Sequence, residues 1–244
     1  MQLTFHGHAC VSLGLPGTSP DSASGSDAAG TLVIDPGTFS DTTTAFAGAR
    51  AVLITHDHPD HVDVLALVEH LAAAPDTQVW ATGPAASALR EAGAPADRVH
   101  EVTPGQVLDV AGARVTVGGG EHALIHPEVP RAVNVTYLVE LPGADGVGGV
   151  GGGSVFHPGD SYDVPAALPE AGLGVLLVPV SGPWMRLSEA IDFARSVPAG
   201  FVVPIHDGLL SEIGHALVGR WLDTARLGGD YKYARLTPGE SLAV

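Results

Sequence analysis

Residues 55–61, Thr-His-Asp-His-Pro-Asp-His, bring three histidines and two aspartates together directly after an apolar run. Imidazole nitrogens and carboxylate oxygens are the ligands that Zn²⁺ and neighbouring transition metals prefer. His56 and His58 are two residues apart, so they would point the same way at the end of a strand. Asp60 and His61 would open the helix that follows. The spacing predicts a metal site at a strand-to-helix corner, and the alternative is a polar turn with incidental histidines.

Three further candidate ligands each follow an apolar, strand-like run: His122, Asp160 and His206. Sites in open α/β sheets collect at the carboxyl ends of strands. A single histidine near a strand end is more often a hydrogen-bonded core or surface residue, so the argument rests on the joint order of these residues. His126 is a rival for His122. We favour His122 because it directly follows the strand, which would place His126 at the pocket wall.

Apolar runs predict the elements that must position these residues. We expect strands over residues 1–15, 31–37, 51–55, 78–81, 133–141, 154–157, 174–180 and 201–206, and a meander over 99–102, 107–110 and 114–117. We expect helices over residues 62–74, 85–92, 187–196 and 211–226. Segments rich in Gly, Ser and Asp predict flexible loops at about 16–30 and 142–153. No linker divides the chain, so the pattern predicts one layered α/β domain over residues 1–244, with two sheets and helices outside.

Composition limits the classes of partner. Asp and Glu outnumber Lys and Arg by 27 to 11, giving a formal net charge of −16. This argues against nucleic acid and against an anionic membrane surface, because both are bound through Lys and Arg. The single cysteine, Cys10, excludes an intrachain disulfide and fits a reducing compartment. With no signal-peptide pattern and no apolar run long enough to span a bilayer, we expect a soluble, cytoplasmic protein. No feature indicates an oligomeric state.

The motif HxHxDH, then a distant His, an Asp after a strand and a final His, resembles the metallo-β-lactamase superfamily over essentially the whole chain. The resemblance implies a four-layer αββα sandwich with two divalent metal ions at the edge between the sheets. It implies that one metal is held by His56, His58 and His122, the second by Asp60, His61 and His206, and that Asp160 bridges both. It also implies that Asp35 supports the ligand loop from the second shell.

Finer features resemble one branch of that superfamily, which includes ascorbate-6-phosphate lactonase and related hydrolases. They are Gly7-His8-Ala9, Ile34-Asp35-Pro36 and Asp60-His61-Val62-Asp63. In that branch the early histidine lies near the site, so His8 is a candidate substrate-binding or second-shell residue; the alternative is a strand histidine packed beside Cys10. Nothing resembles the helical domain with which glyoxalase II binds glutathione, or the added domain of the nuclease branch.

Two divalent ions can share a water and lower its pKa from near 16 to about 7. We therefore hypothesise hydrolysis by metal-activated hydroxide, with Asp60 and Asp160 as the catalytic carboxylates. Zn²⁺ suits a histidine-rich site, and Mn²⁺ and Fe²⁺ fit nearly as well. Asp57 and Asp63 are candidate second-shell acceptors for ligand imidazoles; as surface carboxylates at a helix start they would be equally ordinary.

The sequence indicates the substrate less clearly than it indicates the metal site. Trp184 could stack on a small-molecule substrate and Arg186 could pair with its carboxylate or phosphate, although a surface turn with a packed Trp explains the same residues. Arg131 is a second anion-binding candidate. We expect a small ester, lactone or phosphorylated metabolite. The alternatives are a phosphodiesterase of the same fold and a non-catalytic, metal-dependent binding or sensor protein. A di-iron, oxygen-reducing role would call for a flavin domain, which the sequence lacks.

Overall fold

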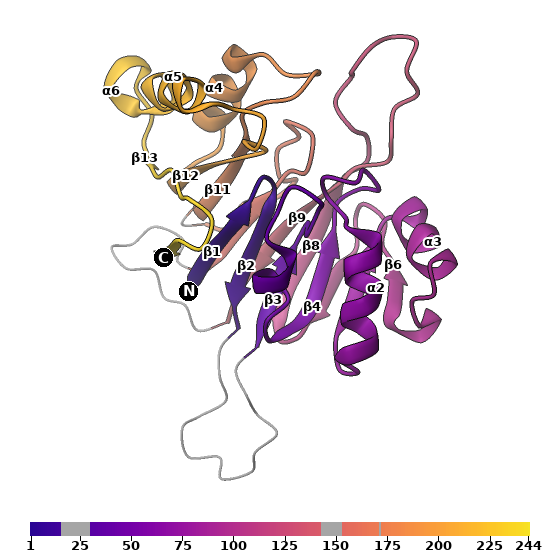
Figure 1. Ribbon diagram of the computed structural model, residues 1–244. Helices are drawn as coiled ribbons and strands as arrows, with labels where there is room; N and C mark the ends of the chain where they lie inside the picture. Colours follow the sequence, from indigo (N-terminus) through magenta and orange to yellow (C-terminus); the bar gives the residue numbers. More distant parts are fainter. Residues whose placement is uncertain (16–29, 143–152, 171) are drawn as a thin grey trace, which may run out of the picture.

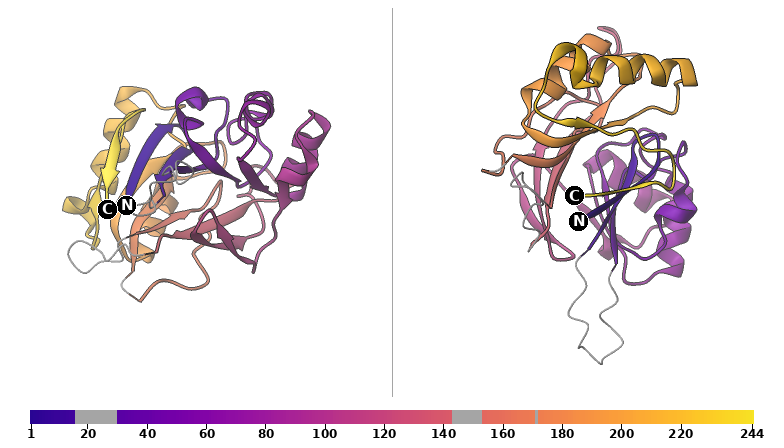
Figure 2. Two further views of the ribbon diagram at one scale, coloured as in Figure 1. Left: turned by 90° about the horizontal axis from the view of Figure 1, so that it is seen from below. Right: turned by 90° about the vertical axis from the view of Figure 1, so that its left-hand side faces the viewer.

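Apolar strands from both halves of the chain pair into two sheets that pack face to face, with helices on both outer sides (Figure 1). The computed structural model describes residues 1–15, 30–142, 153–170 and 172–244. Both predicted flexible loops, 16–30 and 142–153, lie almost entirely outside these residues. The four layers confirm the predicted αββα sandwich in a single domain (Figure 2).

Within the described residues, each sheet has seven strands. The first sheet, in spatial order, contains β14 (Ser241–Ala243), β1 (Gln2–Gly7), β2 (Cys10–Gly14), β3 (Thr31–Ile34), β4 (Ala49–Ile54), β5 (Gln78–Ala81) and β6 (Val99–Glu101). The second contains β13 (Lys232–Tyr233), β12 (Ala199–Ile205), β11 (Leu173–Pro179), β10 (Ser154–His157), β9 (Val135–Glu140), β8 (Ala113–Gly119) and β7 (Val107–Val110). Strands β3 to β6 are parallel, as are β10 to β13, while β7 to β10 are antiparallel.

Helices from each half cover the sheet of the same half. They are α1 (Thr42–Ala45), α2 (Val64–Ala73), α3 (Gly83–Glu91), α4 (Leu187–Ser196), α5 (Glu212–Leu222) and α6 (Thr224–Leu227), with a 3-10 turn at Ala96–Arg98. One apolar cluster fills the space between the sheets, a second lies between the first sheet and α2 and α3, and a third lies between the second sheet and α4 and α5. None of the described helices is long and apolar enough to cross a bilayer.

Four strands run toward the same edge of the sandwich and place candidate ligands there. The loops after β4, β8, β10 and β12 carry residues 56–61, His122, Asp160 and His206. Strands β8, β10 and β12 share one direction because β9 is antiparallel to both β8 and β10, and β10 to β12 are parallel. The topology therefore gathers residues that are up to 150 positions apart in the chain.

The structure corrects four expectations. The strand predicted over residues 1–15 is two strands joined by a turn at His8 and Ala9. Residues 99–101 do not join a meander; β6 pairs with β5 in parallel, because α3 returns the chain to the same sheet and buries Val99 beneath it. The helix after the ligand loop begins at Val64, later than predicted, and the predicted helix 211–226 breaks at Asp223.

Candidate metal centre

Asp35, at the end of β3, holds the ligand loop that follows β4. Its Oδ1 accepts the Thr55 backbone N–H at 2.7 Å, and its Oδ2 accepts the Thr55 hydroxyl at 2.6 Å and the His61 Nδ1–H at 2.7 Å. The Thr55 hydroxyl donates to Asp35, so its oxygen accepts the His56 Nδ1–H at 3.0 Å. Asp35 thereby fixes the tautomer of His61 directly and that of His56 through Thr55. Both Nε2 atoms are left to bind a metal.

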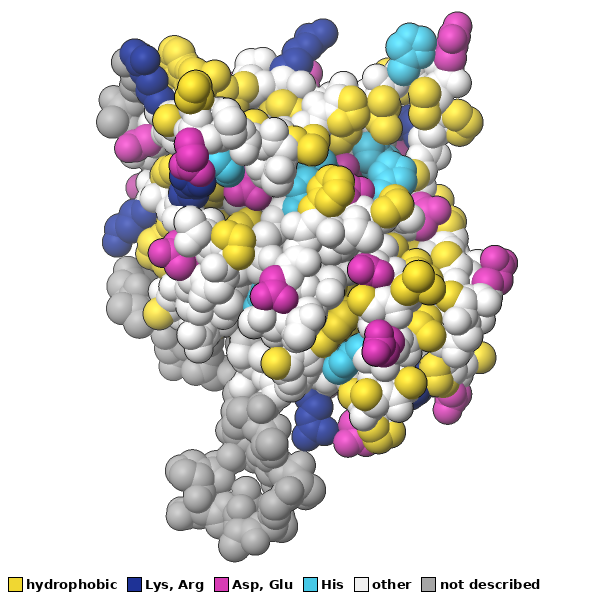
Figure 3. Space-filling view, viewed as in Figure 1, with side chains coloured by type: hydrophobic (Ala, Val, Ile, Leu, Met, Phe, Trp, Pro, Cys, Tyr) yellow, Lys and Arg dark blue, Asp and Glu magenta, His cyan; other side chains and the backbone are white. Residues whose placement is uncertain are grey.

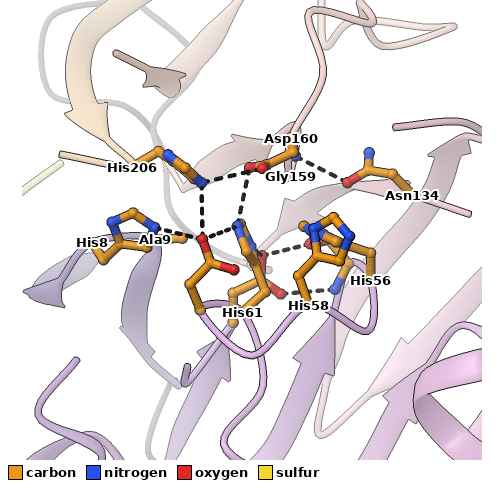
Figure 4. A network of polar contacts seen from close by, with 12 residues as sticks. His8, Ala9, His56, His58, His61, Asn134, Gly159, Asp160 and His206 are labelled. Carbon is orange, nitrogen blue, oxygen red and sulfur yellow. Dashed lines mark hydrogen bonds and ion pairs between the residues drawn. The ribbon is translucent and has the colours of Figure 1, made fainter. Parts of the chain in front are cut away.

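Two groups of side chains converge at the edge between the sheets, and within each group the candidate ligand atoms all lie within 4.8 Å of one another. Figure 4 labels six of these residues, His8, His56, His58, His61, Asp160 and His206. The first group is His56, His58, His122 and Asp160, and the second is His8, Asp60, His61 and His206. The structure thus brings all seven residues of the predicted ligand set together and adds His8. The predicted strand-end geometry differs, because β4 ends at Ile54 and both His56 and His58 lie in the turn beyond it.

Asp160 lies between the two groups. Its Oδ1 is 3.0 Å from His61 Nε2, and its Oδ2 is 3.1 Å from His206 Nε2 and 3.2 Å from His122 Nε2. His122 donates its Nδ1–H to the Ala123 carbonyl at 2.6 Å, which leaves Nε2 facing Asp160. One carboxylate therefore reaches imidazoles of both groups, as the predicted bridging ligand would.

The His8–Ala9 turn is fastened to the second sheet. His206 donates its backbone N–H to the His8 carbonyl at 2.7 Å, and His157 donates its Nε2–H to the Ala9 carbonyl at 2.9 Å. Gly208 donates its backbone N–H to His8 Nδ1 at 3.2 Å, so neutral His8 carries its proton on Nε2, which lies 3.1 Å from Asp60 Oδ2. His8 is therefore placed to donate to Asp60, and it lies at the site rather than within a strand beside Cys10.

Backbone strain is concentrated at this edge. Four described residues other than glycine have a positive φ, and three of them are His8 (53°), Asp35 (50°) and His206 (55°). Such conformations persist where the surrounding structure over-determines them, and they cluster at functional sites. Here the hydrogen bonds of Asp35 and of the His8 turn supply that constraint.

The donor set fits divalent metal ions. His61 Nε2, His206 Nε2 and Asp160 Oδ1 are buried and have no partner in hydrogen-bond geometry among the described residues. Buried polar atoms without a partner are costly, and a metal ion would satisfy all three. Imidazole nitrogens with carboxylate oxygens suit Zn²⁺, Mn²⁺ or Fe²⁺.

The protonation states of the metal-free site also favour cations. Burial alone would lower the pKa of His61, but the charges of Asp160 and Asp35 outweigh it and hold that pKa well above its usual value. Burial likewise opposes the proton on His206, yet the carboxylates of Asp160 and Asp60, 3.1 and 3.3 Å from its Nε2, raise its pKa to about 9. In the metal-free site, the positive charges of protonated His61 and His206 balance the nearby carboxylates. Bound metal ions would supply that positive charge instead.

Four other side chains of the site are already in the form that binds a metal. Burial and the nearby charge of His61 lower the pKa of His56 well below its usual value, and burial lowers that of His58. Despite burial, the pKa values of Asp60 and Asp160 are lowered, through the close contact of His206 and the hydrogen bond of His8 with Asp60 and through His61 beside Asp160. Neutral imidazoles and ionised carboxylates are what metal binding requires.

Two of the predicted substrate residues contact the site. Trp184 donates its Nε1–H to Asp160 Oδ2 at 3.1 Å, and its ring lies 5.9 Å from that of His122. Arg131 donates its Nε–H to the His122 carbonyl at 2.8 Å and pairs with Glu121. It also lines a small cavity beside His58 and His122. Both side chains therefore contact ligand residues, and Arg131 also faces the cavity.

Two further predicted substrate residues, His126 and Arg186, lie further out, whereas His8 lies in the second ligand group. His126 is exposed, accepts the Glu128 backbone N–H and does not line the cavity beside His58, so the structure does not place it at the pocket wall. His122, not His126, lies in the ligand group. Arg186 is exposed at the start of α4, where its backbone N–H is donated to Glu189.

The two remaining aspartates of the ligand loop occupy ordinary positions. Asp63 is the N-cap of α2 and accepts the Ala66 backbone N–H at 3.0 Å, which is the helix-start alternative. Asp57 is exposed and has no hydrogen-bond partner among the described residues. Among the described residues, neither side chain makes a hydrogen bond or ion pair with a ligand imidazole.

Sequence reasoning missed residues that support the site. Asn134 accepts the Asp160 backbone N–H at 3.0 Å and donates to the Pro158 carbonyl at 3.0 Å. Gly159, with φ of 59°, lies so close to Asn134 that a Cβ would be 2.2 Å from its Oδ1. A buried polar residue at the start of an apolar strand is the signal that could have identified Asn134. The Gly208 and Thr55 contacts join segments whose proximity the sequence does not reveal.

Comparison with known proteins agrees with this geometry. A protein-family model described as "Beta-lactamase superfamily domain" matches residues 2–206. Protein Rv0786c of Mycobacterium tuberculosis is 36% identical over 216 residues, which cover 86% of this chain and 86% of that protein. Igni18, a metallo hydrolase from the archaeon Ignicoccus hospitalis, shares the fold with a TM-score of 0.67 and 17% identity, over 99% of this chain and 97% of that one. CmlA, a diiron β-hydroxylase from Streptomyces venezuelae, has a TM-score of 0.67 and 16% identity, over 100% of this chain and 54% of that one.

Proposed function

Because the chain belongs to the β-lactamase superfamily and has the fold of its metal-dependent hydrolases, we propose that its two ligand groups bind two divalent metal ions and that the protein hydrolyses a small ester or lactone. The observation that carries this proposal is the position of Asp160, whose carboxylate lies within 3.2 Å of imidazole nitrogens of both groups. Two divalent ions, when bound, lower the pKa of a shared water and polarise the oxygen under attack.

The residues of the chain would orient the reactants. His8 and His206 hold Asp60 through its Oδ2, and its Oδ1 has no partner among the described residues. Asp60 Oδ1 is therefore the atom that would accept a proton from an attacking water. Asn134 and Trp184 hold Asp160 from its backbone N–H and from its Oδ2. This arrangement supports Asp60 and Asp160 as the catalytic carboxylates.

The charge distribution favours a neutral ester or lactone over a phosphorylated metabolite. Arg131 lines the cavity beside His58, but its guanidinium is already paired with Glu121. The chain as a whole carries a net charge of −16, which opposes the approach of an anion. The resemblance of residues 7–9 and 60–63 to the ascorbate-6-phosphate lactonase branch supports the lactone as the bond cleaved, whereas the charges of this chain oppose the phosphate group of that branch's substrate.

The test is a hydrolysis panel on protein reconstituted separately with Zn²⁺, Mn²⁺ and Fe²⁺. The panel contains lactones, simple esters, thioesters, phosphodiesters and a β-lactam. The Asp60→Ala variant should lose turnover, and Asp97→Ala, which removes an exposed carboxylate far from both groups along the chain, should keep it. Turnover of phosphodiesters alone would favour the phosphodiesterase. The proposal would be contradicted if the Asp60→Ala variant kept the turnover of the wild type. It would also be contradicted if protein with both metal sites filled hydrolysed no compound of the panel.

A further inference from the structure

Large apolar side chains are exposed on the loops that surround the metal centre. Of thirteen exposed large hydrophobic residues in the described part of the chain, eight lie on the loops after β3, β8, β10 and β12. Figure 3 shows histidine side chains on the upper part of one face, flanked by hydrophobic side chains. Scattered exposed apolar residues need no explanation, but a concentration around one site marks an interaction surface.

One part of this surface borders a cavity that two residues of the first ligand group line. His58, His122 and Arg131 form its polar side, and Ile125 and Val129 form its apolar side together with Ala123, Pro130 and Ala132. The cavity measures about 40 Å³. Ile125 and Val129 are 37% and 44% exposed, so each side chain has one surface in the cavity and another at the protein surface.

We propose that this cavity binds the aliphatic part of the substrate, so that the protein prefers esters or lactones carrying a short unbranched carbon chain. The inference rests on the proposed function and names the substrate class of the same site. Because His58 and His122 line the cavity and belong to the first ligand group, a carbon chain bound there would lie on the acyl side of the carbonyl attacked at the metal centre. The products are the carboxylic acid with that chain and the alcohol, or the hydroxy acid from a lactone.

Charge and size limit the occupants. On the apolar side of the cavity, a polar or charged substituent would lose its hydration against Ile125 and Val129 without gaining a partner. On the polar side, the Arg131 guanidinium is already paired with Glu121. A cavity of about 40 Å³ admits a few methylene groups and not a helix or strand of another protein. An anionic lipid surface is opposed by the net charge of −16.

The experiment measures kcat/KM of metal-replete protein for p-nitrophenyl acetate, propionate, butyrate and hexanoate. Each methylene buried in an apolar site contributes about fourfold. We therefore expect kcat/KM to rise from acetate to butyrate by about tenfold or more and then to level off as the cavity fills. In the double variant Ile125→Thr/Val129→Thr, the butyrate-to-acetate ratio should fall to about threefold or less.

The matched controls are Ile213→Thr on α5 and Val107→Thr on β7, both exposed and both outside the cavity. They should keep the wild-type ratio. A wild-type ratio near one, or an equal ratio in the double variant, would overturn the inference while leaving hydrolysis itself established.

If no ester is hydrolysed, the inference is tested by binding. Acetamide, butanamide and hexanamide are titrated into methyl-labelled, metal-replete protein, and the methyl resonances of Ile125 and Val129 are followed by NMR. Those resonances should shift at lower concentration as the chain lengthens. The inference would be refuted if the shifts did not depend on the length of the carbon chain, or if they occurred at methyl groups outside the cavity.

Discussion

His8 and Asp60, 52 residues apart in the chain, form a pair in which His8 Nε2 lies 3.1 Å from Asp60 Oδ2. The pair links the β1–β2 turn to the ligand loop after β4. Because Gly208 donates to His8 Nδ1, the ring presents its proton to Asp60. His8 therefore acts on the site by orienting a carboxylate, and burial keeps its own pKa below the usual value.

Replacing His8 should weaken the second ligand group. His8→Leu removes the donor to Asp60, and losing such a supporting hydrogen bond typically lowers metal affinity or activity by about 10–100-fold. His8→Gln, whose amide can reach the same oxygen, should recover part of the loss. Competition with a chelator gives the affinities. His100→Leu, at the edge strand β6, is the control. Unchanged metal affinity and turnover in His8→Leu would show that the pair is incidental.

Asp35→Asn should lower both stability and metal affinity. Asparagine tolerates the left-handed φ of this position and can still accept the Thr55 backbone N–H. The amide nitrogen that would replace Oδ2 is a donor and can accept from neither the Thr55 hydroxyl nor His61 Nδ1–H. Leaving such buried donors unpaired costs about 1–3 kcal/mol, measurable by denaturant unfolding of metal-free protein. Thr55→Val, which removes the link to His56, should affect the first ligand group more than the second. If Asp35→Asn bound metal at both sites with wild-type affinity, the contacts of Asp35 with Thr55 and His61 would not support the metal ligands as described.

Trp184→Phe distinguishes a residue that positions Asp160 from one that binds substrate. Phenylalanine keeps the ring beside Tyr162 and His122 but removes the Nε1–H donated to Asp160. If the donor positions the carboxylate, kcat should fall by about tenfold or more while KM changes little. A rise in KM at constant kcat would instead assign Trp184 to substrate stacking.

The metal centre should compete with protons. His206 in the folded, metal-free chain has its pKa raised from 6.5 to about 9. Its proton therefore stabilises the metal-free fold fully below pH 6.5, and this contribution is lost as pH rises through about 9. A metal ion must displace that proton, so affinity should increase with pH over the same range. Calorimetry in two buffers of different ionisation enthalpy should show proton release at pH 7. Proton uptake, or affinity independent of pH, would contradict the assignment of His206.

Helices and strands were predicted well where the sequence of the segment itself determines its structure. Residues 78–81 and 187–196 form the strand and helix expected, because their apolar spacing and boundaries are local. Residues 99–101 joined the other sheet because the alternation of a strand does not specify its partner. The HxHxDH loop located the site, and the structure brings His122, Asp160 and His206 to it. The contacts of His8 with Gly208 and of Asn134 with Asp160 were not predictable, because they depend on how the two sheets pack.

Metal content and turnover followed in one titration test the central claim most directly. Metal-free protein is titrated with Zn²⁺, bound metal is counted by mass spectrometry, and hydrolysis of the best ester or lactone of the panel is measured at each point. The two ligand groups predict no turnover without metal and a plateau at two equivalents per chain, with a lower plateau of bound metal in Asp160→Ala. Activity in metal-free protein, or a plateau at one equivalent, would contradict a two-metal hydrolase.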